Sequence, residues 1–374
     1  MRVAFGLTLV ALVGCSSTSN NGDASGGTAG AAGAAGGGGG GTGGATGGAS
    51  GTGGALGGGG GAGGSGTGGI AGAGGSSYCG PIGKVVGTIC QLGKFATGDD
   101  GVAIALDDTY VWWATLTGVR RMRKDATGMV DAVSSSLAAG YHVGGLALDG
   151  SRVCWTEENG AAGPGFVRCR GTDLGQPAAT LASTEVRPTT MAADGTWLFW
   201  ANEGSGTTGN IRKVATGAAS GATDVVTSSS VFNVVTDATE PFVYYASGAT
   251  IRRAGKDANT GAQVFAPNWS PPRLIALSKN YVYFPQSTGI YRVLRKANAT
   301  ETQTSAAVDL TALTIQDETV YWGRKDNSIT YELVDTDGET QLPALGVPAA
   351  IAVDADSIYW VSKNPQGYLA KTKK

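Results

Sequence analysis

Residues Ile351 to Trp360 read Ile-Ala-Val-Asp-Ala-Asp-Ser-Ile-Tyr-Trp, which places two apolar stretches on either side of a short polar turn. This pattern predicts a β-hairpin, because β-branched and aromatic residues favour strands whereas Asp and Ser favour turns. Altered copies of the same phrase occur upstream, and each ends its second stretch on an aromatic anchor. The seven anchors are Trp113, Trp155, Trp200, Tyr245, Phe284, Trp322 and Trp360.

The anchors recur at intervals of about 38 to 45 residues, the period of four-stranded propeller blades. The sequence therefore predicts an all-β fold, a seven-bladed β-propeller in residues 78–374. The last repeat reaches a third strand near Tyr368 to Ala370 and then ends. We expect the stretch Lys94 to Thr97 to supply the missing fourth strand, because a strand from the other end of the domain removes the open sheet edges.

Two polar residue types also recur in the repeats. We expect the aspartate that closes the first strand to hold the turn rather than to act in catalysis, and it occurs as Asp107, Asp149, Asp194, Asp237 and Asp354. Basic residues open the third strand, as in Arg120-Arg121, Arg168, Arg212-Lys213 and Arg252-Arg253. We interpret these basic residues as solvated faces, because nearby aspartates balance their charge.

The N-terminus predicts export. Met1-Arg2 precedes an apolar run from Val3 to Val13 that is too short to span a bilayer, which is typical of a signal peptide. The segment Leu12-Val13-Gly14-Cys15 resembles the lipobox of bacterial lipoproteins, which implies cleavage before Cys15 and acylation of its thiol. Ser16 resembles the pattern that sorts such lipoproteins to the outer membrane. An ordinary signal peptide with an incidental cysteine is the alternative.

Residues 16–77 consist almost entirely of Gly, Ala, Ser and Thr, and they hold many of the chain's 64 glycines. Such a stretch has too few large apolar side chains to offset the entropy of ordering it. We therefore expect a disordered, flexible tether between the acylated Cys15, at the end of the signal-peptide and lipobox segment 1–15, and the propeller.

Charge, histidine and cysteine content indicate which partners, metal sites and disulfides to expect. The formal net charge is −2 and both signs are interspersed, so no basic patch indicates nucleic acid or an anionic membrane surface. A single histidine argues against a multi-histidine metal site, and no cofactor is expected except possible calcium on carboxylates. In an exported protein, Cys79, Cys90, Cys154 and Cys169 predict two disulfides. The local pairs Cys79–Cys90 and Cys154–Cys169 are favoured, with free thiols as the alternative for the second pair.

Across about residues 93 to 374, the repeats resemble the Tyr-Trp-Thr-Asp propellers of the low-density-lipoprotein-receptor type and their bacterial lipoprotein relatives. The aromatic pair carries the resemblance, and Trp155-Thr156-Glu157 is nearest to the full motif. Other copies depart from it, as in Trp113-Ala114-Thr115 and Trp200-Ala201-Asn202. Those receptor propellers have six blades where this chain has seven repeats. The resemblance implies the fold and supplies no catalytic residue.

Function is expected in loops of unequal length and chemistry. In an antiparallel meander, the loops between second and third strands and the links between blades emerge on one side, which we call the mouth face. Variable loops on a rigid scaffold are where recognition normally resides. The predicted binding residues are Asp99, Asp100, Tyr141, His142, Glu157, Arg187, Asn202, Glu203, Phe232, Trp269, Arg273 and Arg324.

The sequence favours a binding module, lipid-anchored in the bacterial envelope and expected at the outer membrane. Its expected partner is an envelope protein or glycan, and we expect a monomer that contacts the membrane through its anchor alone. The alternative is a calcium-dependent propeller hydrolase, lyase or lactonase that uses mouth-face carboxylates. Such an enzyme needs convergent carboxylates, whereas those available here are scattered along the chain.

Overall fold

The computed structural model describes residues 76–374 apart from 135–136, 161–163, 206–207, 229, 258–261, 267–273, 297–299, 335, 337 and 364. The predicted signal peptide, the acylated Cys15 and the tether up to residue 75 lie outside the described residues. None of the helices in the described part of the chain has the length and apolar character that a membrane crossing requires.

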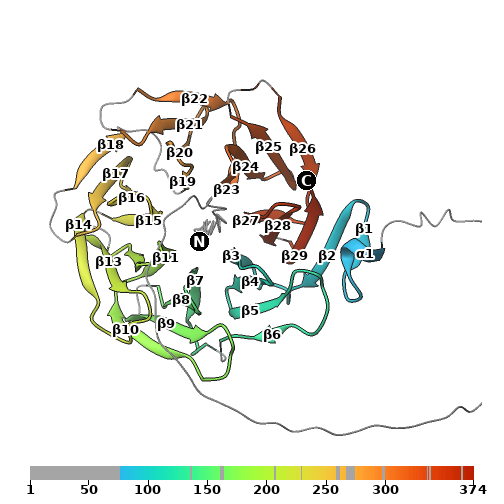
Figure 1. The fold of residues 1–374 in the computed structure, drawn as a ribbon, viewed down its shortest axis with the longest axis horizontal. Helices are drawn as coiled ribbons and strands as arrows, with labels where there is room; N and C mark the ends of the chain where they lie inside the picture. Colours follow the sequence, from blue (N-terminus) through green and yellow to red (C-terminus); the bar gives the residue numbers. More distant parts are fainter. Residues whose placement is uncertain are drawn as a thin grey trace, which may run out of the picture. The chain divides into compact units, whose positions relative to one another are not determined.

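Seven antiparallel sheets form the blades of a β-propeller, arranged around a common centre (Figure 1). Both the all-β class and the number of blades confirm the prediction. In each of blades 1 to 6 the strands follow one another in chain order, from the innermost to the outermost (Figure 1). This meander arises because each short polar turn reverses an apolar strand that can pair only with its predecessor.

The strand bounds follow the repeats. Blade 1 comprises β3 (Gly101–Leu106), β4 (Tyr110–Thr115), β5 (Gly118–Arg123) and β6 (Asp131–Ala132), and blade 2 comprises β7 (His142–Asp149), β8 (Arg152–Glu158), β9 (Gly165–Gly171) and β10 (Ala179–Glu185). Blade 3 comprises β11 (Pro188–Ala193), β12 (Trp197–Asn202), β13 (Gly209–Ala215) and β14 (Thr223–Ser228), and blade 4 comprises β15 (Val231–Thr236), β16 (Phe242–Ser247), β17 (Thr250–Gly255) and β18 (Gln263–Ala266). Blade 5 comprises β19 (Ala276–Leu277), β20 (Tyr281–Gln286), β21 (Gly289–Leu294) and β22 (Thr302–Ser305), and blade 6 comprises β23 (Leu310–Gln316), β24 (Thr319–Arg324), β25 (Ser328–Leu333) and β26 (Thr340–Pro343).

Blade 7 joins the two ends of the domain. Its inner strands are β27 (Val347–Val353), β28 (Ser357–Lys363) and β29 (Tyr368–Lys373), and its outer strands are β2 (Ile89–Lys94) and β1 (Lys84–Val86). The prediction of a closing N-terminal strand is confirmed, but its predicted position at Lys94 to Thr97 is wrong except for Lys94. The strand lies earlier because the side chains of Ile89 and Leu92 are buried in the blade. After the strand, Gly98 has a left-handed backbone with φ of 81°, which turns the chain away from blade 7.

The hydrophobic core is divided among the seven junctions between neighbouring blades. The second strand supplies two consecutive large residues that face opposite sides of the blade. In blade 1, Trp112 packs against blade 2 and Trp113 packs against blade 7. In blade 7, Tyr359 packs against blade 1 and Trp360 packs against blade 6. The repeated aromatic pair therefore stabilises the ring by filling both faces of the blade, except in blade 2, where Cys154 stands in place of the first aromatic residue.

The disulfides are Cys79–Cys90 and Cys154–Cys169, as favoured from the sequence. Cys79 ends the one-turn helix α1 (Ser76–Cys79), so the first bridge fastens this helix to the closing strand β2. Cys154 and Cys169 lie directly opposite each other on β8 and β9. The second bridge therefore links two strands of a single blade.

Four of the five repeated aspartates hold the turns between first and second strands, whereas Asp149 instead pairs with Arg152. Asp194 Oδ1 accepts the backbone N–H groups of Thr196 and Trp197 at 2.9 and 2.7 Å, and Asp107 and Asp354 hold their turns in the same way. In blade 5 the hydroxyl of Ser278 makes the equivalent, longer contacts. These hydrogen bonds are the turn-holding contacts expected from the sequence.

The same aspartates also connect blades. In three blades the residue that follows the third strand is basic and forms an ion pair with the aspartate of the preceding blade. Lys256 Nζ lies 2.6 Å from Asp194, and Lys124 Nζ lies 3.0 Å from Asp354. Arg295 pairs with Asp237 in the same arrangement.

Candidate functional site

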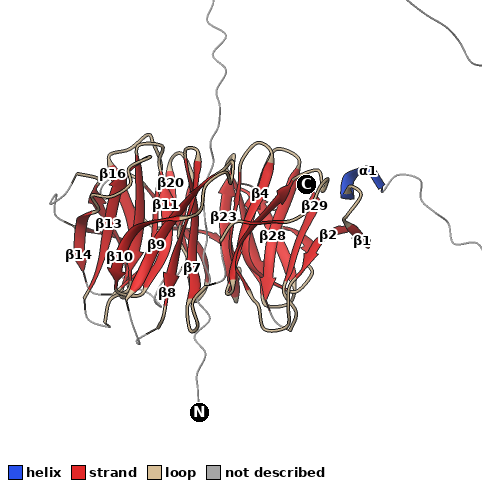
Figure 2. Cartoon of the chain, turned by 90° about the horizontal axis from the view of Figure 1, so that it is seen from below, coloured by secondary structure: helices blue, strands red, loops and turns tan. Residues whose placement is uncertain are grey.

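The blades place two sets of loops on opposite sides of the ring, as Figure 2 shows from the edge. The mouth face carries the loops between second and third strands and the links from each blade to the next. Its side chains come from strand ends, which the neighbouring blades hold in place. Trp269 and Arg273, two of the predicted binding residues, lie outside the described residues.

Asp99 is bound within blade 1 rather than presented to solvent. Its buried carboxylate accepts hydrogen bonds from the Thr117 backbone N–H and hydroxyl at 3.1 and 2.8 Å, and it lies 3.8 Å from the Arg120 guanidinium. The adjacent Asp100 is half-buried. Burial lowers the pKa of Lys363, and the negative charge of Asp100 acts in the opposite direction. Both aspartates therefore face local positive charge.

Glu157 is likewise bound within its own blade. The buried carboxylate accepts a hydrogen bond from Trp155 Nε1 at 2.8 Å and one from Arg168 Nε at 2.9 Å. The Arg168 guanidinium also lies over the Phe166 ring, 4.9 Å from its centroid. An aromatic N–H and an arginine thus hold a single carboxylate.

Arg187, Asn202 and Glu203 are brought together beside blade 3. The Arg187 guanidinium lies 2.6 Å from the Glu203 carboxylate, and the Arg187 carbonyl accepts the Glu203 backbone N–H at 3.0 Å. Arg187 has a left-handed backbone with φ of 53°, which turns the link from blade 2 onto the third blade. Asn202 lies next to Glu203 and points into a separate buried cluster.

The other predicted residues lie apart. Tyr141 donates its hydroxyl to the Pro164 carbonyl at 3.0 Å and packs on Phe166. His142 begins β7 and is exposed. Phe232 packs in the core between blades 4 and 5, and Arg324 lies 3.4 Å from Asp326 at the end of β24. The structure therefore does not gather the predicted residues into a single cluster.

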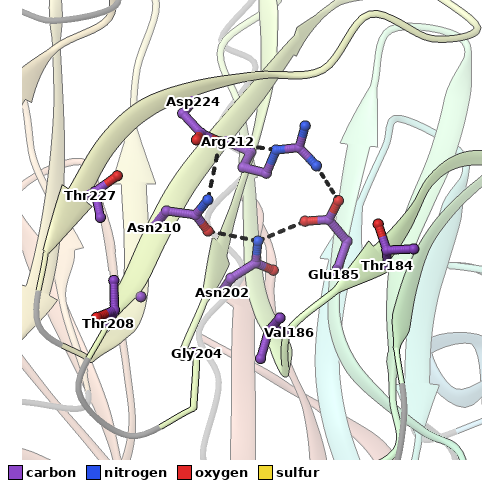
Figure 3. Close-up of a pocket in the computed structure, with 11 residues that line it drawn as sticks. Thr184, Glu185, Val186, Asn202, Gly204, Thr208, Asn210, Arg212, Asp224 and Thr227 are labelled. Atoms are coloured by element: carbon purple, nitrogen blue, oxygen red, sulfur yellow. Dashed lines mark hydrogen bonds and ion pairs between the residues drawn. The ribbon is translucent and has the colours of Figure 1, made fainter.

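Blade 3 carries a polar pocket that the sequence did not predict. It is a cavity of about 310 Å³ lined by Glu185, Asn202, Thr208, Arg212, Asp224 and Thr227 (Figure 3). Glu185 ends β10 of blade 2, and the other five residues belong to blade 3, with Asp224 farther along β14 than Thr227.

Glu185 organises the inner wall of this pocket. Its side chain is 1 % exposed, and its carboxylate accepts a hydrogen bond from Trp200 Nε1 at 2.8 Å. The same carboxylate accepts Asn202 Nδ2 at 2.6 Å and pairs with Arg212 (Figure 3). Arg212 Nε also lies 3.1 Å from Asp224. The opposite side of the Asn202 amide, Oδ1, is buried without a hydrogen-bond partner among the described residues. A buried acceptor is therefore available to a hydrogen-bond donor that enters the pocket.

Sequence reasoning missed Glu185 because it ends a fourth strand, the least regular part of each repeat. The one available signal was a glutamate directly before the link Val186-Arg187-Pro188. Interpreting the third-strand basic residues as solvated faces was also wrong for Arg121 and Lys213, which are both buried. Arg121 lies over the Tyr110 ring and Lys213 over the Trp197 ring, so aromatic surface replaces the expected solvent.

The predicted carboxylates do not converge. Asp99, Glu157 and Glu203 face Arg120, Arg168 and Arg187 respectively. No group of three or more His, Cys, Asp or Glu side chains in the described part of the chain is arranged to hold a metal ion. The described mouth face is therefore a surface of paired charges with one polar pocket.

Comparison with known proteins shows the fold alone. No protein-family model and no curated protein matches the chain. Among solved structures, the WD40 β-propeller domain of Doa1 is 12% identical with a TM-score of 0.58, over 75% of this chain and 95% of that one. U3-55K is 12% identical with a TM-score of 0.58, over 77% and 98%, and the computationally designed Ika8 protein is 12% identical with a TM-score of 0.51, over 78% and 95%. The chain is thus similar to β-propellers in structure.

Proposed function

We propose that the protein is a tethered binding module that presents its mouth face to a protein or glycan ligand. One observation carries this proposal: a polar pocket opens at the mouth-face end of blade 3 on a scaffold whose surrounding charges are already paired. Paired charges fix side chains in place, so a ligand meets a preorganised surface and less binding energy is lost to ordering. Pockets with a few fixed polar groups are the usual form of a ligand site.

The proposed location rests on the sequence. The signal peptide and the lipobox resemblance at Cys15 support an acylated protein of the bacterial envelope, and Ser16 supports the outer membrane. A Gly-rich tether of this length has a root-mean-square span of roughly 40–50 Å. We infer that the propeller, as a monomer, reaches envelope partners at some distance from its anchor.

Capture of partners from envelope extracts tests the pocket. The full chain with Thr208→Trp and Thr227→Trp places two large side chains at exposed positions of the pocket lining. We expect this variant to capture at least tenfold less partner than the wild type, because the indoles fill the space that the ligand needs. A captured protein is identified by mass spectrometry. A glycan ligand is recognised because capture is lost after glycosidase treatment.

Thr223→Trp is the matched control. Thr223 is also exposed and lies on the same strand, β14, but at its opposite end. This variant should capture partner as the wild type does. Equal capture by the pocket variant and the control would contradict the proposal.

A further inference from the structure

Blades 2 and 3 bind a glutamate with the same pair of donors. In each blade the aromatic anchor of the second strand lies opposite an arginine on the third strand, as Trp155 opposite Arg168 and Trp200 opposite Arg212. The indole N–H and the guanidinium both reach one buried carboxylate. Figure 3 shows the guanidinium half of this arrangement, in which Arg212 reaches Glu185.

The glutamate enters these two clusters from different positions. Glu157 follows two residues after the aromatic anchor on the same strand, whereas Glu185 ends the fourth strand of the preceding blade. Each position lets a side chain of this length place its carboxylate between the two donors. The fold therefore holds a glutamate carboxylate with the same two donors in two blades, although the glutamate comes from a different position in each.

Blade 4 repeats the donors but has serine at both acidic positions. Tyr245 lies opposite Arg252, as the anchors of blades 2 and 3 lie opposite their arginines. Ser247 occupies the position of Glu157, two residues after the anchor. Ser228 ends β14 and pairs with Gly209, just as Glu185 ends β10 and pairs with Gly165.

The two serines bond to each other across the junction between blades 3 and 4, with 2.9 Å between their Oγ atoms. Serine lacks the carboxylate and the methylene that carry glutamate to the donors. With serine at both positions, blade 4 keeps its arginine and aromatic hydroxyl but has no glutamate carboxylate of its own between them.

Arg252 has no carboxylate partner in the described structure. Its Nε donates to Thr250 Oγ1 at 3.3 Å, and no ion pair with Asp or Glu involves it there. The flanking residues outside the description, 229, 258–261 and 267–273, include no Asp or Glu in the sequence. A half-buried guanidinium without a carboxylate favours an anion from another molecule.

Tyr245 supplies the second donor. Its side chain is fully buried, and its hydroxyl has no hydrogen-bond partner among the described residues. Burial raises the pKa of Tyr245 and outweighs the opposite effects of the Arg252 charge and of the nearby Ser228 and Arg252 side chains, so the phenol retains its proton. An unsatisfied buried hydroxyl is costly, and a ligand oxygen would remove that cost.

We propose that blade 4 binds the carboxylate of a glutamate side chain from a protein partner, between Arg252 and Tyr245. This inference rests on the proposed binding function and specifies the chemistry of the partner. A glutamate fits because the two occupied clusters of this chain hold the same side chain. Ser228 is adjacent to Thr227 of the blade 3 pocket, so one partner can occupy both sites.

Two peptides test the site on the full chain. The probes are acetyl-Gly-Glu-Gly-amide and acetyl-Gly-Gln-Gly-amide, and the measurement is the melting temperature at low salt as peptide concentration rises. We expect a saturable rise with the Glu peptide and none with the Gln peptide, which has nearly the same shape but no charge. Arg252→Gln should abolish the rise.

Arg253→Gln is the matched control. Arg253 is the next residue on β17 and points to the other side of the sheet, where its guanidinium bonds Gln263 and the Arg295 carbonyl. This variant should keep the response to the Glu peptide. Equal responses to both peptides, or a full response in Arg252→Gln, would overturn the inference.

A second variant supplies the carboxylate from within the chain. Ser247→Glu restores the arrangement of blade 2, and we expect it to raise the melting temperature by about 2–4 °C and to abolish the peptide response. If Glu at this buried position prevents folding, Ser228→Glu at the half-buried position replaces it. Adding Arg252→Gln should remove the rise in melting temperature that the new glutamate gives, and an unchanged rise would contradict the site.

The two proposals fail separately. Capture by the Thr208→Trp and Thr227→Trp variant tests the blade 3 pocket, whereas the peptides test blade 4 alone. A partner captured by the wild type without any response to the Glu peptide would refute the glutamate site and leave the binding function standing.

Discussion

The side chain of Asp237 both holds a turn and pairs with the neighbouring blade. Its Oδ1 accepts the Thr239 N–H at 2.8 Å and the Thr239 hydroxyl at 2.7 Å, which holds the turn in blade 4. Its other oxygen pairs with Arg295 of blade 5. Burial alone would raise the pKa of Asp237, but the bonds from Thr239 and the charge of Arg295 hold it below its usual range.

This lowered pKa predicts how stability depends on pH. A carboxyl with a lower pKa in the folded state stabilises the fold above its unfolded pKa of about 3.9, and the stabilisation is lost as pH falls through the folded value. Asp237→Asn should therefore lower the free energy of unfolding by about 2 kcal/mol at pH 7, because Arg295 loses its nearer carboxylate. The difference from wild type should shrink below about pH 4.

Urea unfolding at pH 7 and near pH 3 measures this difference. Asp108→Asn, an exposed substitution in the corresponding turn of blade 1, controls for a general effect of removing a carboxylate. An Asp237→Asn deficit that stays constant between the two pH values would contradict the assigned role.

At the scale of strands and turns, residues of neighbouring blades form matched pairs. Lys124, Lys256 and Arg295 each follow a third strand and face an aspartate of the preceding blade, whereas Lys374 of blade 7 bonds Gln316 of blade 6. Where Val334 follows the third strand of blade 6, the preceding blade carries Ser278 instead. Val334 still donates its backbone N–H to the turn at Glu318, as Lys256 does to Pro241, so the backbone contacts remain when the ion pair is absent.

This matching predicts that partners must change together. Lys256→Val leaves the Asp194 carboxylate buried without its cation and should lower the free energy of unfolding by about 3 kcal/mol. Adding Asp194→Ser should recover most of that loss, because a serine holds the equivalent turn in blade 5. Chemical denaturation of both variants and of Asp194→Ser alone completes the double-mutant cycle. Simple addition of the two single losses would show that the residues do not act as a pair.

At the scale of the whole molecule, the ring is closed by a strand from the opposite end of the domain. β2 pairs with β29, and Leu92 joins the core that blade 7 shares with blade 1. The Cys79–Cys90 bridge holds α1 against this strand, whereas the Cys154–Cys169 bridge lies within blade 2. The two disulfides should therefore differ in which part of the molecule they protect.

Hydrogen exchange distinguishes the two bridges. Cys79→Ala with Cys90→Ala should reduce stability by about 2–4 kcal/mol and accelerate amide exchange first in β2 and β29. Cys154→Ala with Cys169→Ala removes a bridge of similar loop length and should accelerate exchange in β8 and β9 instead. Uniform acceleration across all blades in the first variant would show that the bridge does not act on ring closure.

The sequence predicted the repeated parts of this protein better than its unique parts. The anchor Trp360 and its six counterparts predicted the blades, because each blade must bury large side chains on both faces. The closing strand was misplaced because Lys94 to Thr97 lies outside the repeat pattern. Glu157 was found beside its anchor on the same strand, whereas Glu185, which performs the same task from the preceding blade, was missed.

By itself, the sequence determined the number of blades, their order and the aromatic cores between them, because strand pairing and burial repeat locally along the chain. Only the tertiary structure decided which charges meet. Glu185 with Arg212, Lys256 with Asp194, and Arg252 without a carboxylate all depend on contacts between blades. The repeat pattern places these residues along each blade but does not show which side chains of neighbouring blades face one another, so the pairs appear only in the folded ring.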